Sequence, residues 1–110
     1  MSAAAFDIQI TQGAENDLEE IVSHVAGAYS RSAADALLND LLTPITLESL
    51  PFRGATPREL EDLGMSQFRQ LVFSHYRVIY LVVEQTVFIS LIADGRRDMQ
   101  DLLQRRLLRG

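Results

Sequence analysis

The chain has 110 residues, the length of one domain, and no cysteine, so disulfides and thiolate metal sites are excluded and a cytoplasmic setting is expected. Fifteen acidic residues face ten basic ones, all of them arginine, for a net charge of −5 at pH 7. This balance argues against direct nucleic-acid binding, which depends on a basic field. The chain has no membrane-length apolar run and no metal-ligand spacing. We therefore expect no membrane segment, no metal and no cofactor.

A short strand and two helices are expected first. Residues 6–10 alternate apolar and polar side chains, as a half-buried strand does. From Ala14 to Tyr29 apolar residues recur at helical spacing, and Thr11 is a plausible N-cap. A second helix is expected from a Ser32 cap to Leu50, with a kink at Pro44. The two helices would form an antiparallel hairpin.

The stretch 67–98 organises the chain, because it holds three runs of β-branched, aromatic and aliphatic residues at 68–73, 76–83 and 86–92. The polar breaks between them have the length of hairpin loops, which predicts an antiparallel meander. Residues 52–66 read as an exposed connection that leads into it. After the meander, Asp98 can cap a last helix with an apolar face.

These elements predict a single α+β domain over residues 1–110, in the order β-α-α-β-β-β-α. We expect the strand at residues 6–10 to complete a four-stranded antiparallel sheet. The helical hairpin of residues 14–50 should cover one face of this sheet, because both helices and the strands carry apolar positions while each helix keeps one polar face.

Five segments carry a family resemblance that covers nearly the whole chain. They are the acidic first helix at 14–21, the helix end at 50–54, the strand at 68–72, the motif Tyr76-Arg77-Val78-Ile79-Tyr80 and the turn Asp94-Gly95-Arg96-Arg97-Asp98. In this order and spacing they resemble the ParE/RelE superfamily of bacterial toxins. The resemblance implies a RelE/ParE-like fold and the toxin of a type II toxin–antitoxin system. Such a toxin is held inactive in a hetero-oligomer by an antitoxin usually encoded beside it.

The superfamily divides by target. RelE-like members cut messenger RNA in the ribosomal decoding site, whereas ParE-like members, among them plasmid stabilisation proteins, inhibit DNA gyrase. RelE-like toxins are typically basic, with lysines and a late tyrosine or histidine, but this chain is acidic, lacks lysine and has neither residue after Tyr80. The connector at 51–54 and the Arg96-Arg97 turn look ParE-like. We therefore expect an inhibitor that binds the gyrase A subunit and needs no catalysis. One departure is Asp94, where many relatives have histidine.

The candidate residues for binding a target or partner are arginines of the turn and of the last helix, namely Arg96, Arg97, Arg105 and Arg106. A guanidinium can bind a carboxylate or a phosphate in a bidentate fashion. The alternative is structural. A nearby aspartate could pair with one arginine of the turn while the other points elsewhere, and the basic pair of the last helix could simply complement the helix dipole.

A ribonuclease would need a proton acceptor, a proton donor and a phosphate clamp. The candidates for these roles are Arg69, His75, Arg77, Tyr80 and Arg97. The pattern favours a buried ion pair for Arg77, an exposed turn for His75 and sheet packing for Tyr80, and it leaves Arg69 either lining the open face of the sheet or solvated. Two classes thus stay open, a protein-binding inhibitor and a ribosome-dependent endoribonuclease. A third reading is an inactivated toxin kept as an antitoxin-binding module.

Overall fold

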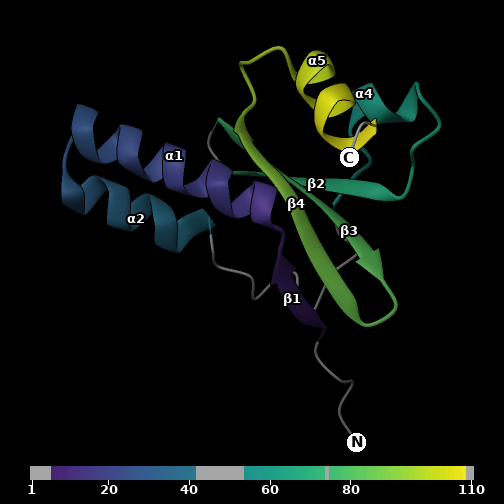
Figure 1. Cartoon of the computed structure of the whole chain (residues 1–110), viewed down its shortest axis with the longest axis horizontal. Helices are drawn as coiled ribbons and strands as arrows, with labels where there is room; N and C mark the ends of the chain where they lie inside the picture. Colours follow the sequence, from purple (N-terminus) through teal and green to yellow (C-terminus); the bar gives the residue numbers. More distant parts are fainter. Residues whose placement is uncertain (1–5, 42–53, 74, 109–110) are drawn as a thin grey trace, which may run out of the picture.

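The computed structural model describes residues 6–41, 54–73 and 75–108. The elements along these residues follow the expected order, and Figure 1 shows their arrangement. They are β1 (Asp7–Ile10), α1 (Gln12–Ala28), α2 (Arg31–Leu41), α4 (Arg58–Glu61), β2 (Phe68–Phe73), β3 (Tyr76–Val83), β4 (Thr86–Asp94), α5 (Met99–Leu103) and the π-helical turn η1 (Gln104–Leu108). Within the described residues, no helix is both long enough and apolar enough to span a membrane.

The four strands form one sheet in the order β1-β4-β3-β2. The expected meander is confirmed, because β2 pairs with β3 and β3 with β4 in antiparallel fashion. The expectation of a wholly antiparallel sheet is corrected at its edge, where β1 pairs with β4 in parallel. A tight turn forces two strands to run in opposite directions, but β1 reaches β4 only through the helical hairpin and most of the chain, so no hairpin sets its direction.

A β-bulge at Ser90 gives β4 two buried faces. Ile79 pairs with Leu91 and Tyr80 pairs with Ile89, so Ser90 has no partner on β3. The extra residue reverses the alternation of side chains along the strand. Ile89 and Ile92 therefore belong to the same core cluster, whereas Leu91 belongs to the cluster on the opposite face.

The first core cluster lies between the sheet and α1. It includes Ala14 and Leu18 of α1 with Tyr80, Val87 and Ile89 of the strands. In Figure 1, the first part of α1 lies against the middle of β4 and the rest of the helix extends outward, with α2 beside it. The expected packing of the hairpin on the sheet is thus made directly by α1, and α2 packs chiefly on α1.

The second core cluster fills the opposite face, which the sequence had left open. It joins Leu60 of α4 and Leu103 of α5 to Ile79 and Leu91 of the sheet, and all four side chains have no exposed area. The hairpin covers one face of the sheet, as expected, and α4 and α5 cover part of the other face (Figure 1). The bulge makes this possible by turning Leu91 toward α5.

Local side chains fix the helix starts. The Thr11 hydroxyl accepts a hydrogen bond from Ala14 N at 3.2 Å, which confirms the N-cap of α1. The Asp98 carboxylate likewise accepts one from Asp101 N at 3.1 Å at the start of α5. The Ser32 cap of the second helix is wrong, because α2 begins at Arg31 and the hydroxyl that accepts a bond from Ala33 N is that of Ser30, at 3.0 Å.

The connection before the meander is more ordered than expected. Where the structure describes it, from Gly54 onward, it contains the short helix α4 and the fully buried Leu60, so the reading of residues 52–66 as an exposed connection is corrected. The expected kink at Pro44, the helix end at Leu50 and the connector at 51–53 lie outside the described residues.

Candidate functional site

The turn after β4 carries the two adjacent arginines, and Arg96 is engaged within it. Its guanidinium binds both carboxylate oxygens of Asp94, with Nη2 2.6 Å from Oδ2 and Nε 2.9 Å from Oδ1. The Arg96 backbone N–H also donates to Asp94 Oδ1 at 2.9 Å. The Arg96 hydrogen bond lowers the pKa of Asp94 from 3.8 to about 2, with desolvation opposing it. Arg96 therefore fixes the turn, which is one of the two roles expected for this pair.

The shifted pKa of Asp94 predicts a pH-dependent contribution to stability. A carboxyl whose pKa is depressed on folding stabilises the fold above its unfolded pKa, and this stabilisation disappears as the pH falls through the folded value. For Asp94 the window runs from about 4 down to about 2. We expect Asp94→Asn to lower the urea midpoint of unfolding at about pH 5, and the difference from the parent chain to close toward about pH 2. A difference that stays constant over this range would contradict the assignment.

Arg97 makes no comparable contact. Its backbone N–H donates to Asp94 O at 3.1 Å, but within the described residues its exposed guanidinium has no ion pair or hydrogen bond. Adjacent residues on a turn point in different directions, which accounts for the different roles of Arg96 and Arg97. Of the two arginines, Arg97 is the one whose side chain is available to another molecule.

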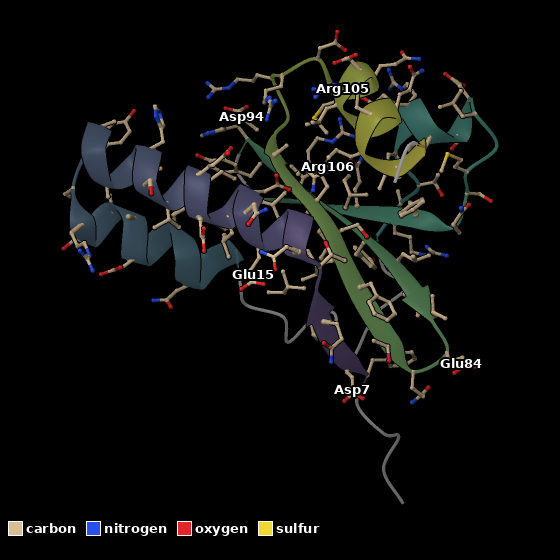
Figure 2. The ribbon with its side chains drawn as sticks, in the orientation of Figure 1. Asp7, Glu15, Glu84, Asp94, Arg105 and Arg106 are labelled. Atoms are coloured by element: carbon tan, nitrogen blue, oxygen red, sulfur yellow. The ribbon has the colours of Figure 1, made fainter. Side chains whose placement is uncertain are left out.

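Arg97 borders a pocket of about 160 Å³, which we call the α1–turn pocket. One wall is a single face of α1, where the lining residues recur at helical spacing, and the other is formed by the ends of β3 and β4 with the turn. Figure 2 shows Asp94 at this turn, above α1. The lining residues are Asp17, Glu20, Ile21, His24, Tyr76, Ile92, Ala93, Asp94 and Arg97.

The arginines of the last helix are both paired. Arg105 Nε lies 2.9 Å from Asp101 Oδ2, an exposed contact one helical turn away. Arg106 reaches across to α1, where its guanidinium binds both oxygens of Asp17 at 2.8 and 3.1 Å. Figure 2 shows Arg106 between the last helix and α1, and Arg105 beside the outer part of α5. Arg106 is thus a structural link, which the reading as a helix C-terminus did not predict.

Asp17 and Arg106 together satisfy the backbone at the bulge. Asp17 Oδ2 accepts a hydrogen bond from Ile92 N at 3.1 Å, and Arg106 Nη2 donates to Ser90 O at 3.2 Å. The bulge removes these groups from the regular ladder, so they need other partners. Asp17 lies in the acidic segment at 14–21, and no signal within that segment could have revealed this role.

Arg77 forms the ion pair that its position in the strand favoured, but this pair is partly and not fully buried. Its guanidinium binds both oxygens of Glu59 on α4, at 3.0 and 2.9 Å, and its Nε donates to Gln70 Oε1 at 2.6 Å. The hydrogen bonds from Arg77 lower the pKa of Glu59 below its ordinary value. Arg77 therefore anchors α4 to the sheet, and the sequence had left its acidic partner unnamed.

Tyr80 and Arg69 both bind Gly54, the first described residue of the connection that leads into the meander. Tyr80 is fully buried, and its hydroxyl accepts a hydrogen bond from Gly54 N at 3.0 Å. Arg69, which lies opposite Tyr80 in the β2–β3 pair, donates from Nη1 to Gly54 O at 2.7 Å. The packing expected for Tyr80 is confirmed, and Arg69 is half-buried under the connection.

The five ribonuclease candidates are not gathered at one place. Arg77 lies on the sheet face that α4 covers, whereas Tyr80 and Arg69 belong to the other face. His75 is in the β2–β3 turn, with Nε2 3.7 Å from Asp94 Oδ2, and Arg97 borders the α1–turn pocket. Among the described residues no group of acids and histidines has the arrangement of a metal site. What the turn and the pocket offer is a set of charged groups suited to binding.

The topology defines the protein as an α+β domain in which a helical hairpin and a closing helix flank a three-stranded meander. Residues 8–99 match the family described as the ParE toxin of the type II toxin–antitoxin system, parDE. The chain belongs to the ParE toxin family of the ParE/RelE superfamily. Among curated proteins, none matches the chain.

Three solved structures share this fold at low sequence identity. The chromosomal ParDE toxin–antitoxin system from P. aeruginosa superposes with a TM-score of 0.68 at 16% identity, covering 84% of this chain and 98% of that one. The toxin–antitoxin complex RelBE2 from Mycobacterium tuberculosis gives 0.58 at 17% identity, covering 84% and 94%. A doubly substituted RelE toxin from E. coli in the free state gives 0.61 at 15% identity, covering 96% and 97%. These likenesses confirm the fold expected from the sequence.

Proposed function

We propose that this toxin inhibits DNA gyrase by binding its A subunit, and that a cognate antitoxin neutralises it in a cytoplasmic hetero-oligomer. The ParE family supports the toxin role and the antitoxin partner. The ParDE neighbour is a toxin–antitoxin system and the RelBE2 neighbour is a toxin–antitoxin complex, which supports the same kind of partner for this chain. Inhibition by binding needs a complementary surface and no bond-making step.

The choice of gyrase over messenger RNA as the target rests on the burial and pairing of the candidate cleavage residues. Tyr80 has no exposed area, which removes it as a proton donor. Arg77 holds both oxygens of Glu59 in a bidentate ion pair, which occupies the guanidinium that would clamp a phosphate. A cleavage site needs such groups close to one scissile bond. The net charge of −5 also opposes entry into the dense phosphate of a ribosomal site.

Arg97 is the residue we assign to the target contact. Its guanidinium is exposed and unpaired among the described residues, on a turn that Arg96 and Asp94 hold in place. A fixed backbone lowers the conformational entropy lost on binding, and arginine is enriched among the residues that dominate binding energy. The other three candidate arginines each bind an aspartate already, so their contribution would be to hold the shape of the binding surface. They are Arg96, Arg105 and Arg106.

The test compares two activities on the same preparations. We expect the parent chain to inhibit gyrase supercoiling and to leave ribosome-bound messenger RNA intact. Arg97→Ala should weaken inhibition by ~10-fold or more, the loss typical of a central interface arginine. Arg31→Ala is the matched control, because Arg31 is an exposed arginine at the start of α2, on the helical hairpin, and it should leave inhibition unchanged.

The outcomes separate the three readings. Strong cleavage of messenger RNA without inhibition of supercoiling would overturn the gyrase assignment in favour of an endoribonuclease. Inactivity in both assays, with binding to the protein encoded by the adjacent gene retained, would indicate an antitoxin-binding module. A rise in melting temperature when that neighbour is added is expected for a cognate antitoxin, because a ligand that binds only the folded state stabilises it.

A further inference from the structure

The α1–turn pocket combines apolar lining residues with a hydroxyl group that has no hydrogen bond among the described residues. Ile21 and Ile92 are its apolar lining residues from α1 and β4. Tyr76 also lines it, and this side chain is only 8% exposed. Within the described residues the Tyr76 hydroxyl forms no hydrogen bond, and no buried side-chain oxygen there lacks a partner, so this oxygen is accessible in the pocket. The ring is buried while its oxygen stays accessible, so the hydroxyl can form a hydrogen bond with a ligand.

The charged groups around this hydroxyl are mainly hydrogen-bond acceptors. Three carboxylates line the pocket, those of Asp17, Glu20 and Asp94, and they face one guanidinium, that of Arg97. Asp17 and Asp94 are held in place by Arg106 and Arg96, whereas Glu20 has no partner among the described residues. Burial, and to a lesser extent Asp94, raises the pKa of Tyr76, so its hydroxyl stays neutral and can accept a hydrogen bond.

The helix that forms one wall of the pocket is also negatively charged. α1 contains no arginine or lysine between Gln12 and Ala28, and it exposes Glu15, Glu19 and Glu20. With the whole chain at −5, this face attracts a cationic partner and repels an anionic one.

We propose that the α1–turn pocket receives an arginine side chain presented by a partner polypeptide. The planar guanidinium offers five N–H donors, which match the carboxylates of Glu20 and Asp94 and the hydroxyl of Tyr76. Its methylene groups would lie on Ile21 and Ile92. Arginine suits such a half-apolar site better than lysine, because a guanidinium is less strongly hydrated than an ammonium group. The inference goes beyond the proposed function, since it does not depend on which target the toxin inhibits.

A small probe tests the pocket without any partner protein. N-acetyl-arginine N-methylamide is titrated into the ¹⁵N-labelled chain near neutral pH, and the backbone amides of Ile21, His24 and Ala93 are followed by NMR. We expect saturable shifts with a Kd on the order of 1 mM. The citrulline analogue, which has the same shape without the charge, should bind roughly tenfold more weakly.

Four variants locate the binding. Tyr76→Phe keeps the ring and removes only the hydroxyl, and should weaken binding ~3–10-fold. Glu20→Gln should weaken it ~3–5-fold, whereas Glu19→Gln, an equally exposed acid of α1 that does not line the pocket, should have no effect. Arg97→Ala should leave binding of the arginine probe equal or stronger, because it removes a like charge. The NMR spectra also report whether each variant is folded.

Three results would overturn the proposal. Equal binding of the citrulline analogue would remove the role of charge. Equal losses of probe affinity in Glu19→Gln and Glu20→Gln would indicate general electrostatic attraction to α1 and no defined binding site. Saturable binding of acetate that Arg97→Ala abolishes would identify an anion site in place of a site for arginine.

Discussion

Replacing Asp17 by alanine is expected to lower the free energy of unfolding by about 2–4 kcal/mol, a large effect for a helix residue in an acidic stretch. Asp17 holds the Arg106 guanidinium through two hydrogen bonds and accepts the N–H of Ile92 beside the bulge. Its removal leaves a partly buried cation and a backbone donor without partners. The measurement is urea denaturation monitored by circular dichroism.

Two controls test whether the loss of stability comes from the contact between Asp17 and Arg106. Glu15→Ala removes another acid of the same helix, which is exposed and forms no ion pair with the described residues, and should change stability by no more than about 0.5 kcal/mol. Arg106→Ala combined with Asp17→Ala should cost less than the sum of the two single changes, because each single variant already breaks the pair. Additive losses would show that Asp17 and Arg106 act independently.

Much of the fold could be predicted because it rests on local chemistry. The bounds of β2 and β3 match the apolar runs at 68–73 and 76–83, and β4 extends the expected strand only to Asp94. Thr11 and Asp98 were identified as caps because a cap bonds a backbone N–H only a few residues away. The Ser30 cap was missed because two serines flank Arg31 and either could begin a helix.

The features that sequence reasoning missed depend on distant contacts. The parallel direction of β1, the bulge at Ser90 and the burial of Leu60 are each set by elements elsewhere in the chain. Leu60 lies between Gly, Pro and charged residues, whose composition is typical of a loop, and α4 acquires its stability from packing on α5. Periodicity gives no signal in a helix of four residues.

The contacts of the candidate site show the same difference between local contacts, which could be predicted, and distant contacts, which could not. That one arginine of the turn would pair locally was predictable, because Asp94 and Arg96 are two residues apart. Arg106 and Asp17 are separated by 89 residues, so a cluster that reads as a simple basic helix end is in part a tertiary link. An acid that supports a charge on a distant helix looks, in sequence, like any other acid on a solvent-facing side.

Gly54→Ala is expected to lower the free energy of unfolding by about 2–3 kcal/mol, through overpacking at a fully enclosed position. A Cβ at residue 54 would lie 2.5 Å from Gln70 O and 2.5 Å from the Tyr80 hydroxyl. Neither can move aside, since Gln70 N holds the backbone of Ala55 at 2.8 Å and Tyr80 is fully buried. Relief of the clash would break the bonds from Gly54 to Tyr80 and Arg69.

Gly27→Ala provides a control of opposite sign. Gly27 lies inside α1, and a Cβ there would meet no atom within 4 Å. Alanine restricts the unfolded chain and favours the helix, so this variant should gain about 0.5–1 kcal/mol. Thermal and urea unfolding of both variants tests the contrast. A Gly54→Ala chain as stable as the parent would mean that the connection is free to move off the sheet, and Tyr80 and Arg69 would then have to be reconsidered as accessible groups.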